Sequence, residues 1–548
     1  MDKNIMTRQN KISSAWFVLA LYMGLLVLVM CFHEPWMDEA QAWQIARGAS
    51  LRELFTTVTH YEGHPPLWHL ILMPFAKLGM PYEISLKGIS FVICSISMSF
   101  VIFRAPFPKI VRYLLPFNYF FFYQYGVISR NYCLMTLGFI LAAMTWKKKN
   151  EKPVLFVLSL ALLCGASSYG IILSGGICVA WLLELWKGKT ISGFFNELIQ
   201  KKRLFALGSL LVWALGMIYL VLPQKDTYAF QEKKGSSFFY GLFRFVFISL
   251  PDAVYSNICF NLSSRADIFE MAAGLFQGGL LILLIIVVGR GFKKNALFWI
   301  PFSLLALFSS RFYFSIHHTG IITLLLLFWL WVCMEDGGFV FPEWLQKALK
   351  TERDRKSLKG VGYLVMGVVL VTPVYWSISA SYHDVKVCYG EGRQMSAFIK
   401  EHEIDKGLVM GSWKVKEGEK DFTPWNINLI QGTALMPYFD HNFIYNYNSG
   451  NDNKAYLTHE SGDLDVVLEE WRKKGYPDYI IGSCDLYSLF GKEADVPVYV
   501  PIYQEIAMLN IWKDWKSPYP TYIFARKDIV DSREDLKEVE LRNDLHLQ

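Results

Sequence analysis

The sequence predicts a polytopic α-helical membrane protein that ends in a small α/β domain. Of its 548 residues, 53% are hydrophobic and only 19% are charged, and the mean hydropathy is positive, at +0.27. The apolar residues come in runs of roughly 16 to 23, the length that crosses about 30 Å of hydrocarbon as a helix. After about residue 382 the composition changes to that of a soluble chain. Together these observations favour an integral membrane protein.

About eleven segments have the length and hydropathy of a membrane-spanning helix. They cover approximately residues 15–32, 84–104, 113–129, 132–146, 153–170, 171–187, 204–222, 269–289, 295–310, 319–334 and 360–381. The first segment has no small-residue cleavage site after it, so we expect an uncleaved helix rather than a signal peptide.

Basic residues indicate how these helices are oriented. If the N-terminus is cytoplasmic, alternation places the loops that begin near 104, 147, 187, 290 and 335 in the cytoplasm, and each is rich in Lys and Arg. This agrees with the positive-inside rule. The net charge of +6 therefore reflects membrane orientation, and we expect no nucleic-acid partner. An odd number of spans leaves the C-terminal part outside.

Two modules follow from this division, a membrane module (1–381) and a C-terminal extracytoplasmic domain (382–548). In the second module, helical patterns at 395–402 and 464–474 alternate with strand patterns at 407–411, 479–482 and 521–525. Alternation of helices and strands is typical of a small α/β domain. Its two cysteines, Cys388 and Cys484, are able to pair if the domain is outside the cytoplasm.

Two outer loops are long, at about 33–83 and 223–268, and the first is the more informative. A short helix is expected over 39–47, closed by Gly48, a common C-cap residue. A second begins at Ser50, with Glu53 completing a capping box. Short amphipathic helices beside a span are expected to lie flat in the membrane interface. After His64-Pro65-Pro66, a further apolar helix over 67–77 is too short to span.

Ionisable residues cluster at the outer ends of the predicted helices. Asp38 at the membrane boundary is placed to act as a general base on an acceptor hydroxyl, or simply to cap helix 39–47. Glu39 is a second catalytic candidate, although a negative charge in the first turn also suits the helix dipole. Glu62 and His64 are candidate ligands of a divalent metal ion, or His64 only hydrogen-bonds the loop.

A lipid-phosphate substrate would need cations at the same side of the membrane. Arg130 and Arg311 fall at outer helix ends, and the planar guanidinium matches phosphate oxygens in two-point contact. His317 and His318 follow Arg311 closely. The alternatives are that the arginines snorkel to the interface and that the histidines pack among aromatic residues.

Three motifs in order make the sequence resemble a known family. They are Asp38-Glu39 directly after helix 1, His64-Pro65-Pro66-Leu67, and Arg130-Asn131-Tyr132 at an outer helix end. The sequence resembles the GT-C class of glycosyltransferases, and within it the bacterial branch grouped with protein O-mannosyltransferases and lipid A aminoarabinose transferases.

The resemblance covers roughly the first 190 residues and the overall layout. It implies a polyprenyl-phosphate-linked sugar as donor, a glycan, lipid or protein as acceptor, and an outer-leaflet active site in a bacterial plasma membrane. It implies that Asp38 is a general base or a metal ligand, and that Arg130 and Tyr132 contact the donor phosphate. In the aminoarabinose group the motif before proline is Glu-Lys-Pro, whereas this chain has Glu62-Gly63-His64-Pro65.

Other functions remain as alternatives. A flippase or transporter is expected to carry midplane polar groups and repeated halves, and the sequence has neither. An O-antigen-ligase-like enzyme shares the donor class without the Asp-Glu pair after helix 1. A sensor that binds a ligand through the C-terminal domain is the third alternative.

Overall fold

The computed structural model describes most of the chain. The described residues are 3–225, 237–255, 268–312, 314–348, 351–387, 389–390, 392–412, 421–422, 429–446, 454, 456–457, 462–482, 496–512 and 515–541. The possible pairing of Cys388 with Cys484 lies outside these ranges.

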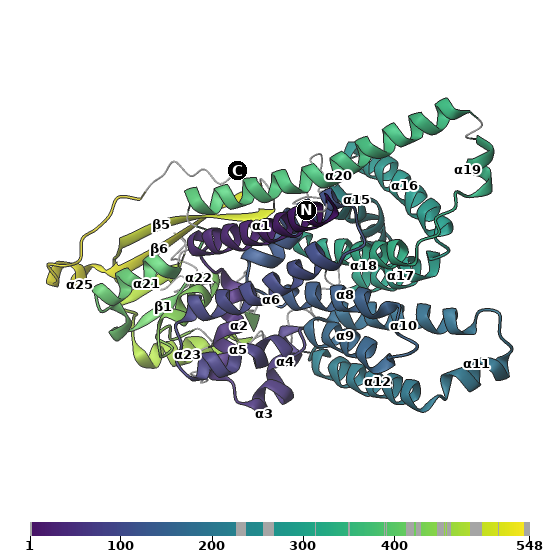
Figure 1. Cartoon of the computed structure of the whole chain (residues 1–548). Coiled ribbons are helices and arrows are strands. Elements are labelled where there is room, and N and C mark those ends of the chain that lie inside the picture. Colours follow the sequence, from purple (N-terminus) through teal and green to yellow (C-terminus); the bar gives the residue numbers. More distant parts are fainter. Residues whose placement is uncertain are drawn as a thin grey trace.

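Long helices build a bundle with the C-terminal domain at one end (Figure 1). They are α1 (Lys3–Phe32), α6 (Tyr82–Arg104), α8 (Tyr132–Trp146), α9 (Pro153–Ala166), α10 (Ser168–Trp186), α12 (Lys201–Val221), α16 (Ile268–Gly291), α17 (Asn295–Arg311), α18 (Gly320–Asp336) and α20 (Glu352–Lys386). Eight helical segments in the described part of the chain are long and apolar enough to cross a membrane. The prediction of a polytopic membrane protein is confirmed.

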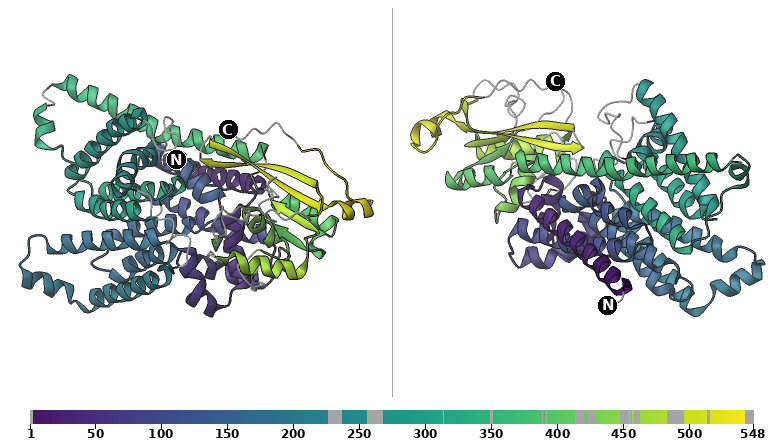
Figure 2. Two further views of the ribbon diagram at one scale, coloured as in Figure 1. Left: turned by 180° about the vertical axis from the view of Figure 1, so that it is seen from behind. Right: turned by 45° about the horizontal axis from the view of Figure 1, so that its top comes forward.

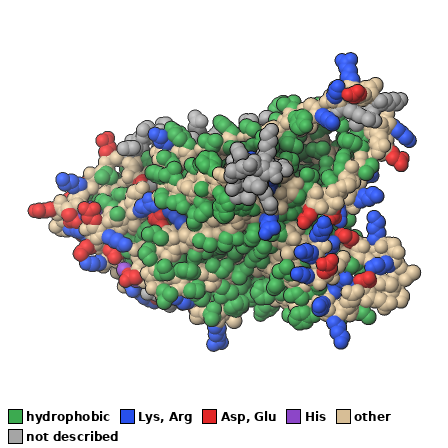
Figure 3. Space-filling view, in the orientation of Figure 1, with side chains coloured by type: hydrophobic (Ala, Val, Ile, Leu, Met, Phe, Trp, Pro, Cys, Tyr) green, Lys and Arg blue, Asp and Glu red, His purple; other side chains and the backbone are tan. Residues whose placement is uncertain are grey.

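The bundle has two distinct ends, which we call the domain end and the loop end. The loop end carries α11 (Ile191–Leu198) and α19 (Glu343–Ala348). There Lys149 pairs with Glu184 at 3.2 Å, and Lys294 pairs with Asp336 at 2.8 Å. Lys294 also lies 3.8 Å from Glu184. These ion pairs join the ends of helices that the predicted alternation of spans places on the same, cytoplasmic side of the membrane. Figure 3 shows hydrophobic side chains over the middle of one face and charged ones towards both ends.

The predicted span at 113–129 is not one regular helix. It consists of α7 (Lys109–Leu114), the short η2 (Leu115–Phe117) and the wide-turned η3 (Phe120–Val127). Asn118 adopts an extended backbone between η2 and η3, and its side-chain oxygen accepts a hydrogen bond from the Phe120 amide at 2.9 Å. A polar residue that bonds the local backbone competes with the helix, which explains the break.

Part of the second predicted outer loop is helical, which the sequence reasoning missed. It forms α14 (Phe238–Arg244), η5 (Phe245–Ser249) and α15 (Leu250–Tyr255). Gly241 lies against Ser310 of α17, and Gly274 of α16 lies against Phe247. Thr323 of α18 donates a hydrogen bond to the Ala253 carbonyl. These contacts are near the domain end of each helix, so the segment packs across that end of the bundle.

The C-terminal domain is a small α/β unit with its own hydrophobic core (Figure 2). Its four-stranded sheet has the order β1-β4-β6-β5, and only β1 and β4 run parallel. The strands are β1 (Val409–Gly411), β4 (Tyr479–Gly482), β5 (Tyr499–Trp512) and β6 (Trp515–Arg526), and the helices include α21 (Gly392–Glu401), α22 (Leu429–Leu435) and α23 (Leu464–Lys474). The predicted alternation of helices and strands is confirmed.

Polar contacts hold this domain against the bundle. Arg393 of α21 makes a two-point ion pair with Glu83 of α6, with N–O distances of 3.0 and 2.6 Å. The Tyr438 hydroxyl donates to the same carboxylate at 2.6 Å. The Arg393 amide donates to Glu34 at 2.5 Å. The domain is therefore tied to the segment that follows α1 and to the start of α6.

The first long loop folds into short helices at the domain end. They are α2 (Met37–Gly48), α3 (Leu51–Glu53), η1 (Leu54–Val58), α4 (Thr59–Glu62) and α5 (Leu67–Lys77). Ser50 and Glu53 form the predicted capping box, with hydrogen bonds of 2.8 and 3.1 Å. The helix predicted over 67–77 is α5.

Candidate functional site

Asp38 and Arg130 meet at the domain end of the bundle. Arg130 lies in the turn between η3 and α8, and its Nη1 is 2.6 Å from Oδ2 of Asp38. The Arg130 side chain is 14% exposed and that of Asp38 is 27% exposed. The pair is therefore partly desolvated and still accessible to a ligand. Two residues that the sequence singled out separately form one polar site.

Asp38 does not cap helix α2, so that alternative is wrong. The helix begins at Met37, two residues before the predicted start, and Trp36 is the N-cap. Glu39 supplies the cap, because its carboxylate accepts a hydrogen bond from the Trp36 amide at 3.1 Å. The side chain of Asp38 is left to face Arg130. An acidic residue at this position is also favoured by the helix dipole.

Glu39 is fully buried, and its carboxylate holds the turn that carries Arg130. It accepts a hydrogen bond from the Ser129 amide at 2.6 Å. Its other oxygen lies 3.1 Å from Nε2 of His33. A buried carboxylate with these partners has no access to a substrate. The geometry therefore favours a positioning role for Glu39, which follows Asp38 in the chain and bonds Ser129, the residue before Arg130.

His33 extends this network to the last helix of the bundle. Its Nδ1 lies 2.8 Å from Oδ2 of Asp384 in α20, and the Tyr123 hydroxyl donates to the other oxygen of Asp384 at 2.9 Å. Burial alone would lower the pKa of His33, but the carboxylates of Glu39 and Asp384 outweigh it and raise the pKa to about 9. His33 is therefore a buried cation between two carboxylates at neutral pH.

Sequence reasoning missed His33 and Asp384. The signal for His33 was its place at the end of the first span, because ionisable residues at membrane boundaries are often functional. Asp384 carried a weaker signal, since it lies in the last turns of a long helix. Their contact joins residues 351 positions apart, and nothing local in the sequence indicates it.

Aromatic rings and histidines surround Arg130. The Arg130 guanidinium lies over the Tyr132 ring at 5.4 Å, and Tyr132 stacks on Tyr125 with ring centroids 4.9 Å apart. His64 meets Tyr132 edge-on at 6.4 Å, and His318 lies 5.8 Å from Tyr132. The contact between the Arg130 guanidinium and the face of the Tyr132 ring is itself attractive. The Arg-x-Tyr motif therefore forms one wall of the site.

The adjacent histidines His317 and His318 join this wall. The rings of His317 and His318 are 4.1 Å apart, and the His317 carbonyl accepts a hydrogen bond from the Tyr125 hydroxyl at 3.0 Å. Nδ1 of His318 accepts from the Ser315 amide at 2.9 Å. The neutral imidazole of His318 therefore carries its proton on Nε2.

His64 is neutral in this environment. Burial first, and then the positive charge of Arg130, lower the pKa of His64 to about 3. Glu62, two residues earlier, accepts a hydrogen bond from Gln41 at 2.9 Å. In the part of the chain that the structure describes, no group of three or more His, Cys, Asp and Glu side chains is arranged to hold a metal ion. The metal site at Glu62 and His64 stays a prediction.

Arg311 is placed differently from the other predicted residues. It is exposed at the last residue of α17, next to Phe312, whose ring stacks on Phe308 at 4.5 Å. Among the described residues, no ion pair or hydrogen bond joins Arg311 to the Arg130 site. A direct phosphate contact by Arg311 stays a prediction.

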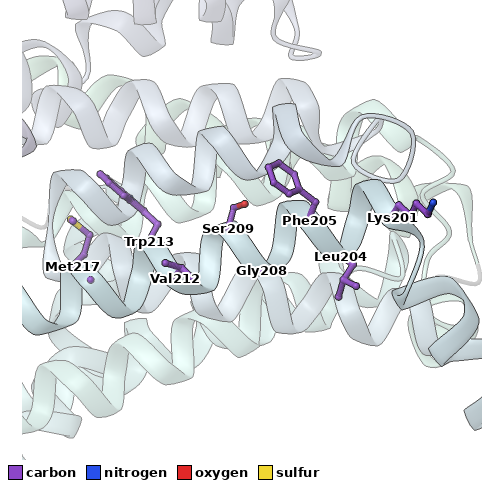
Figure 4. Close-up of a pocket in the computed structure, with 9 residues that line it drawn as sticks. Lys201, Leu204, Phe205, Gly208, Ser209, Val212, Trp213 and Met217 are labelled. Atoms are coloured by element: carbon purple, nitrogen blue, oxygen red, sulfur yellow. The ribbon is translucent and has the colours of Figure 1, made fainter.

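A separate groove of about 890 Å³ runs along α12 (Figure 4). One side of that helix lines it, from Lys201 at the loop end to Met217, with Gly208, Val212 and Trp213 between them. Its lining is almost entirely apolar, as expected for a helix face against lipid. None of the candidate site residues lines this groove, so the polar chemistry lies elsewhere.

Comparison with known proteins gave matches to solved structures only. No protein-family description and no curated protein matches the sequence. The fold is similar to the crystal structure of ArnT from Cupriavidus metallidurans bound to undecaprenyl phosphate, at 12% identity and a TM-score of 0.48. The alignment covers 94% of this chain and 98% of that one. The apo structure of the same ArnT gives a TM-score of 0.46 at 12% identity, with the same coverage.

Proposed function

We propose that this protein is an integral-membrane glycosyltransferase that moves a sugar from a polyprenyl-phosphate donor to a hydroxyl acceptor. The observation that carries the proposal is the Asp38–Arg130 pair, a carboxylate and a guanidinium 2.6 Å apart at one end of a membrane bundle. The transfer would take place on the side of the membrane where the C-terminal domain lies. The charge pattern favours an orientation with that domain outside, and the resemblance to GT-C glycosyltransferases implies the bacterial plasma membrane as the location.

Arg130 is the proposed phosphate ligand. A phosphate group that approaches Arg130 competes with Asp38 for the guanidinium, because both are anions that match its planar N–H groups. Donor binding would therefore release the Asp38 carboxylate. The fixed position of Arg130, held through Ser129 by buried Glu39, supplies the preorganisation that charge stabilisation requires.

Asp38 is the proposed general base. Its carboxylate takes the proton of the acceptor hydroxyl while the acceptor oxygen forms a bond to the anomeric carbon. The bond between that carbon and the phosphate oxygen breaks, and its electron pair leaves with the polyprenyl phosphate. Arg130 stabilises the charge that develops on this leaving group.

Neutral side chains complete the proposed donor site. Tyr132 places an aromatic face beside Arg130, and His64 is uncharged because of its burial and the nearby guanidinium. Neutral imidazoles and phenol rings are suited to hydrogen-bonding and stacking against a sugar without competing for the phosphate.

The test compares wild type with Asp38→Asn in a native host that lacks its own copy, at matched protein levels. Polyprenyl-phosphate lipids are profiled by mass spectrometry. Asp440→Asn, which removes an exposed carboxylate in the C-terminal domain, is the matched control.

We expect a glycosylated polyprenyl phosphate to accumulate in Asp38→Asn and not in the control, because the donor is no longer consumed. The mass of that lipid identifies the sugar. Identical lipid profiles in all three strains would refute the transferase proposal.

A further inference from the structure

The groove along α12 owes its depth to small residues (Figure 4). Ser209 lies between the bulky Phe205 and Trp213 along the helix, and Gly208 and Gly216 stand in the adjacent row. A Cβ atom added at either glycine would meet nothing within 4 Å. The absent side chains therefore leave an elongated apolar hollow, which fits an extended hydrocarbon chain.

A lysine lines the groove at the loop end. Lys201 is the first residue of α12, and Lys202 and Arg203 follow it. The helix dipole disfavours cations at a helix N-terminus, so these residues do not serve the stability of α12. The positive-inside rule requires basic residues in this loop, but it does not require one of them to line a groove. A cation at the end of an apolar groove matches a lipid with an anionic head group.

The charge near this end of the groove is not neutralised by the protein. Residues 187–203 include five basic residues and one acidic residue, Glu197. Glu197 is already paired, with Arg203 at 3.0 Å and with Lys189 at 3.2 Å. Three exposed lysines take part in no ion pair among the described residues, namely Lys187, Lys201 and Lys202. Clusters of this kind beside a span attract anionic lipids.

The short helix α11 places these lysines at the level of the head groups. Ile191, Phe195 and Ile199 follow each other at four-residue spacing and are all exposed. Trp186, at the end of α10, is also exposed. A short helix with an exposed apolar face among lysines is typical of the membrane interface, and so is an exposed tryptophan at the end of a span. Lys201 therefore lies where the phosphates of one leaflet lie.

We propose that the loop-end half of this groove binds an anionic phospholipid, with its phosphate at Lys201 and Lys202 and one acyl chain against Gly208. The charge pattern makes the leaflet at the loop end the cytoplasmic one. The proposal is independent of the proposed glycosyl transfer, since the Asp38–Arg130 pair lies at the domain end.

The length of one leaflet limits how far the chain reaches. Half of a hydrocarbon core of about 30 Å is about 15 Å, or roughly ten residues of α-helix. Gly208 is about 10 Å from Lys201 along α12, and Gly216 is about 22 Å from it. The chain of a lipid from this leaflet therefore covers Gly208 and stops before Gly216. A polyprenyl chain whose phosphate is at Arg130 enters from the opposite end and reaches Gly216 first.

The test uses the full-length protein in detergent and native mass spectrometry with two lipids of identical acyl chains, dioleoyl phosphatidylglycerol and dioleoyl phosphatidylcholine. Gly208→Leu fills the groove, and Gly175→Leu is the matched control, because Gly175 is exposed on α10, has no neighbour within 4 Å and does not line the groove. Leucine is a better helix former than glycine, so both variants should fold. Lys201→Gln removes the cation, and Lys152→Gln removes an exposed lysine at the same end of the bundle.

We expect wild type and both controls to bind phosphatidylglycerol at least about fivefold more tightly than phosphatidylcholine. Lys201→Gln should lower the affinity for phosphatidylglycerol about fivefold, the effect of one lysine near an anionic lipid. Gly208→Leu should lower it by a similar factor, because the leucine side chain takes the space of the acyl chain. Gly216→Leu should leave it unchanged.

The inference is overturned if wild type binds the two lipids equally, since the groove would then hold only bulk lipid. It is also overturned if Gly208→Leu binds phosphatidylglycerol as Gly175→Leu does, or if Lys201→Gln binds it as Lys152→Gln does. Undecaprenyl phosphate is titrated in parallel. A loss of its binding in both Gly208→Leu and Gly216→Leu would assign the groove to the donor chain and overturn the inference as well.

Discussion

Glu39 and Asp38 are adjacent carboxylates, and the structure predicts a large loss of local stability when Glu39 loses its charge and a small one when Asp38 does. Glu39 is fully buried and bonds the amides of Trp36 and Ser129 and the ring of His33. Breaking a buried charge pair by neutralising one partner costs about 3 to 5 kcal/mol. Asp38 is 27% exposed, and an accessible ion pair contributes about 0 to 1 kcal/mol. Glu39→Gln should therefore loosen the turn at 127–131, and Asp38→Asn should not.

Hydrogen–deuterium exchange of the peptide that contains Ser129 measures this difference. A loss of about 3 kcal/mol in local stability corresponds to a roughly 150-fold faster exchange of protected amides, at 1.36 kcal/mol for each factor of ten. For Asp38→Asn the increase should stay below about fivefold. Glu39→Gln should also lower undecaprenyl phosphate binding, because Arg130 is no longer held in place. The assigned positioning role is refuted if exchange in Glu39→Gln stays within threefold of wild type.

Three further predictions follow from the same contacts. The pKa of His33 is raised from 6.5 to about 9 in the folded protein, so its stabilising contribution is complete below about pH 6.5 and is lost as the pH rises through about 9. The melting temperature of wild type should fall over that interval, and that of His33→Asn should be lower and independent of pH there. Arg130→Lys should weaken undecaprenyl phosphate binding about tenfold or more in native mass spectrometry, because lysine lacks the planar fork; equal affinity would argue against Arg130 as the phosphate ligand. Arg393→Ala should loosen the C-terminal domain by removing the two-point pair with Glu83, seen as faster limited proteolysis near residue 390, whereas an unchanged cleavage rate would mean that other contacts hold the domain.

Much of the fold could be predicted because hydrophobic periodicity and capping act locally. The helices at 67–77 and 464–474 and the strand at 479–482 coincide with α5, α23 and β4. The capping box at Ser50 and Glu53 was also predicted. In each case the residues that define the element lie within one or two turns of each other, so the sequence alone carries the information.

The errors arose where tertiary contacts decide the structure. The helix at 238–255 is apolar and aromatic without a clear start signal, and it is stabilised by packing against the ends of α16, α17 and α18. The long hairpin of β5 and β6 contains Pro501, Pro518 and Pro520, which normally argue against a strand. Only part of β6 was predicted.

The candidate site likewise combines residues that local sequence predicts with contacts that only the tertiary structure decides. Asp38, Arg130, His64 and His318 were predicted from their own surroundings and Tyr132 from the family resemblance, and the structure brings these residues together. Which of the two adjacent carboxylates faces Arg130 was not predictable, because it depends on a helix start that lay two residues earlier than expected. The contact between His33 and Asp384 was also not predictable, because the two residues are 351 positions apart.

The contact between His33 and Asp384 has a consequence for biosynthesis. His33, Glu39 and Arg130 are all inserted early, whereas Asp384 reaches the membrane only after another 350 residues or so have been translated. Until α20 arrives, the positive charge on His33 has one carboxylate instead of two, and Tyr123 lacks its acceptor. The buried network that holds the turn before Arg130 is therefore complete only after α20 has been synthesised.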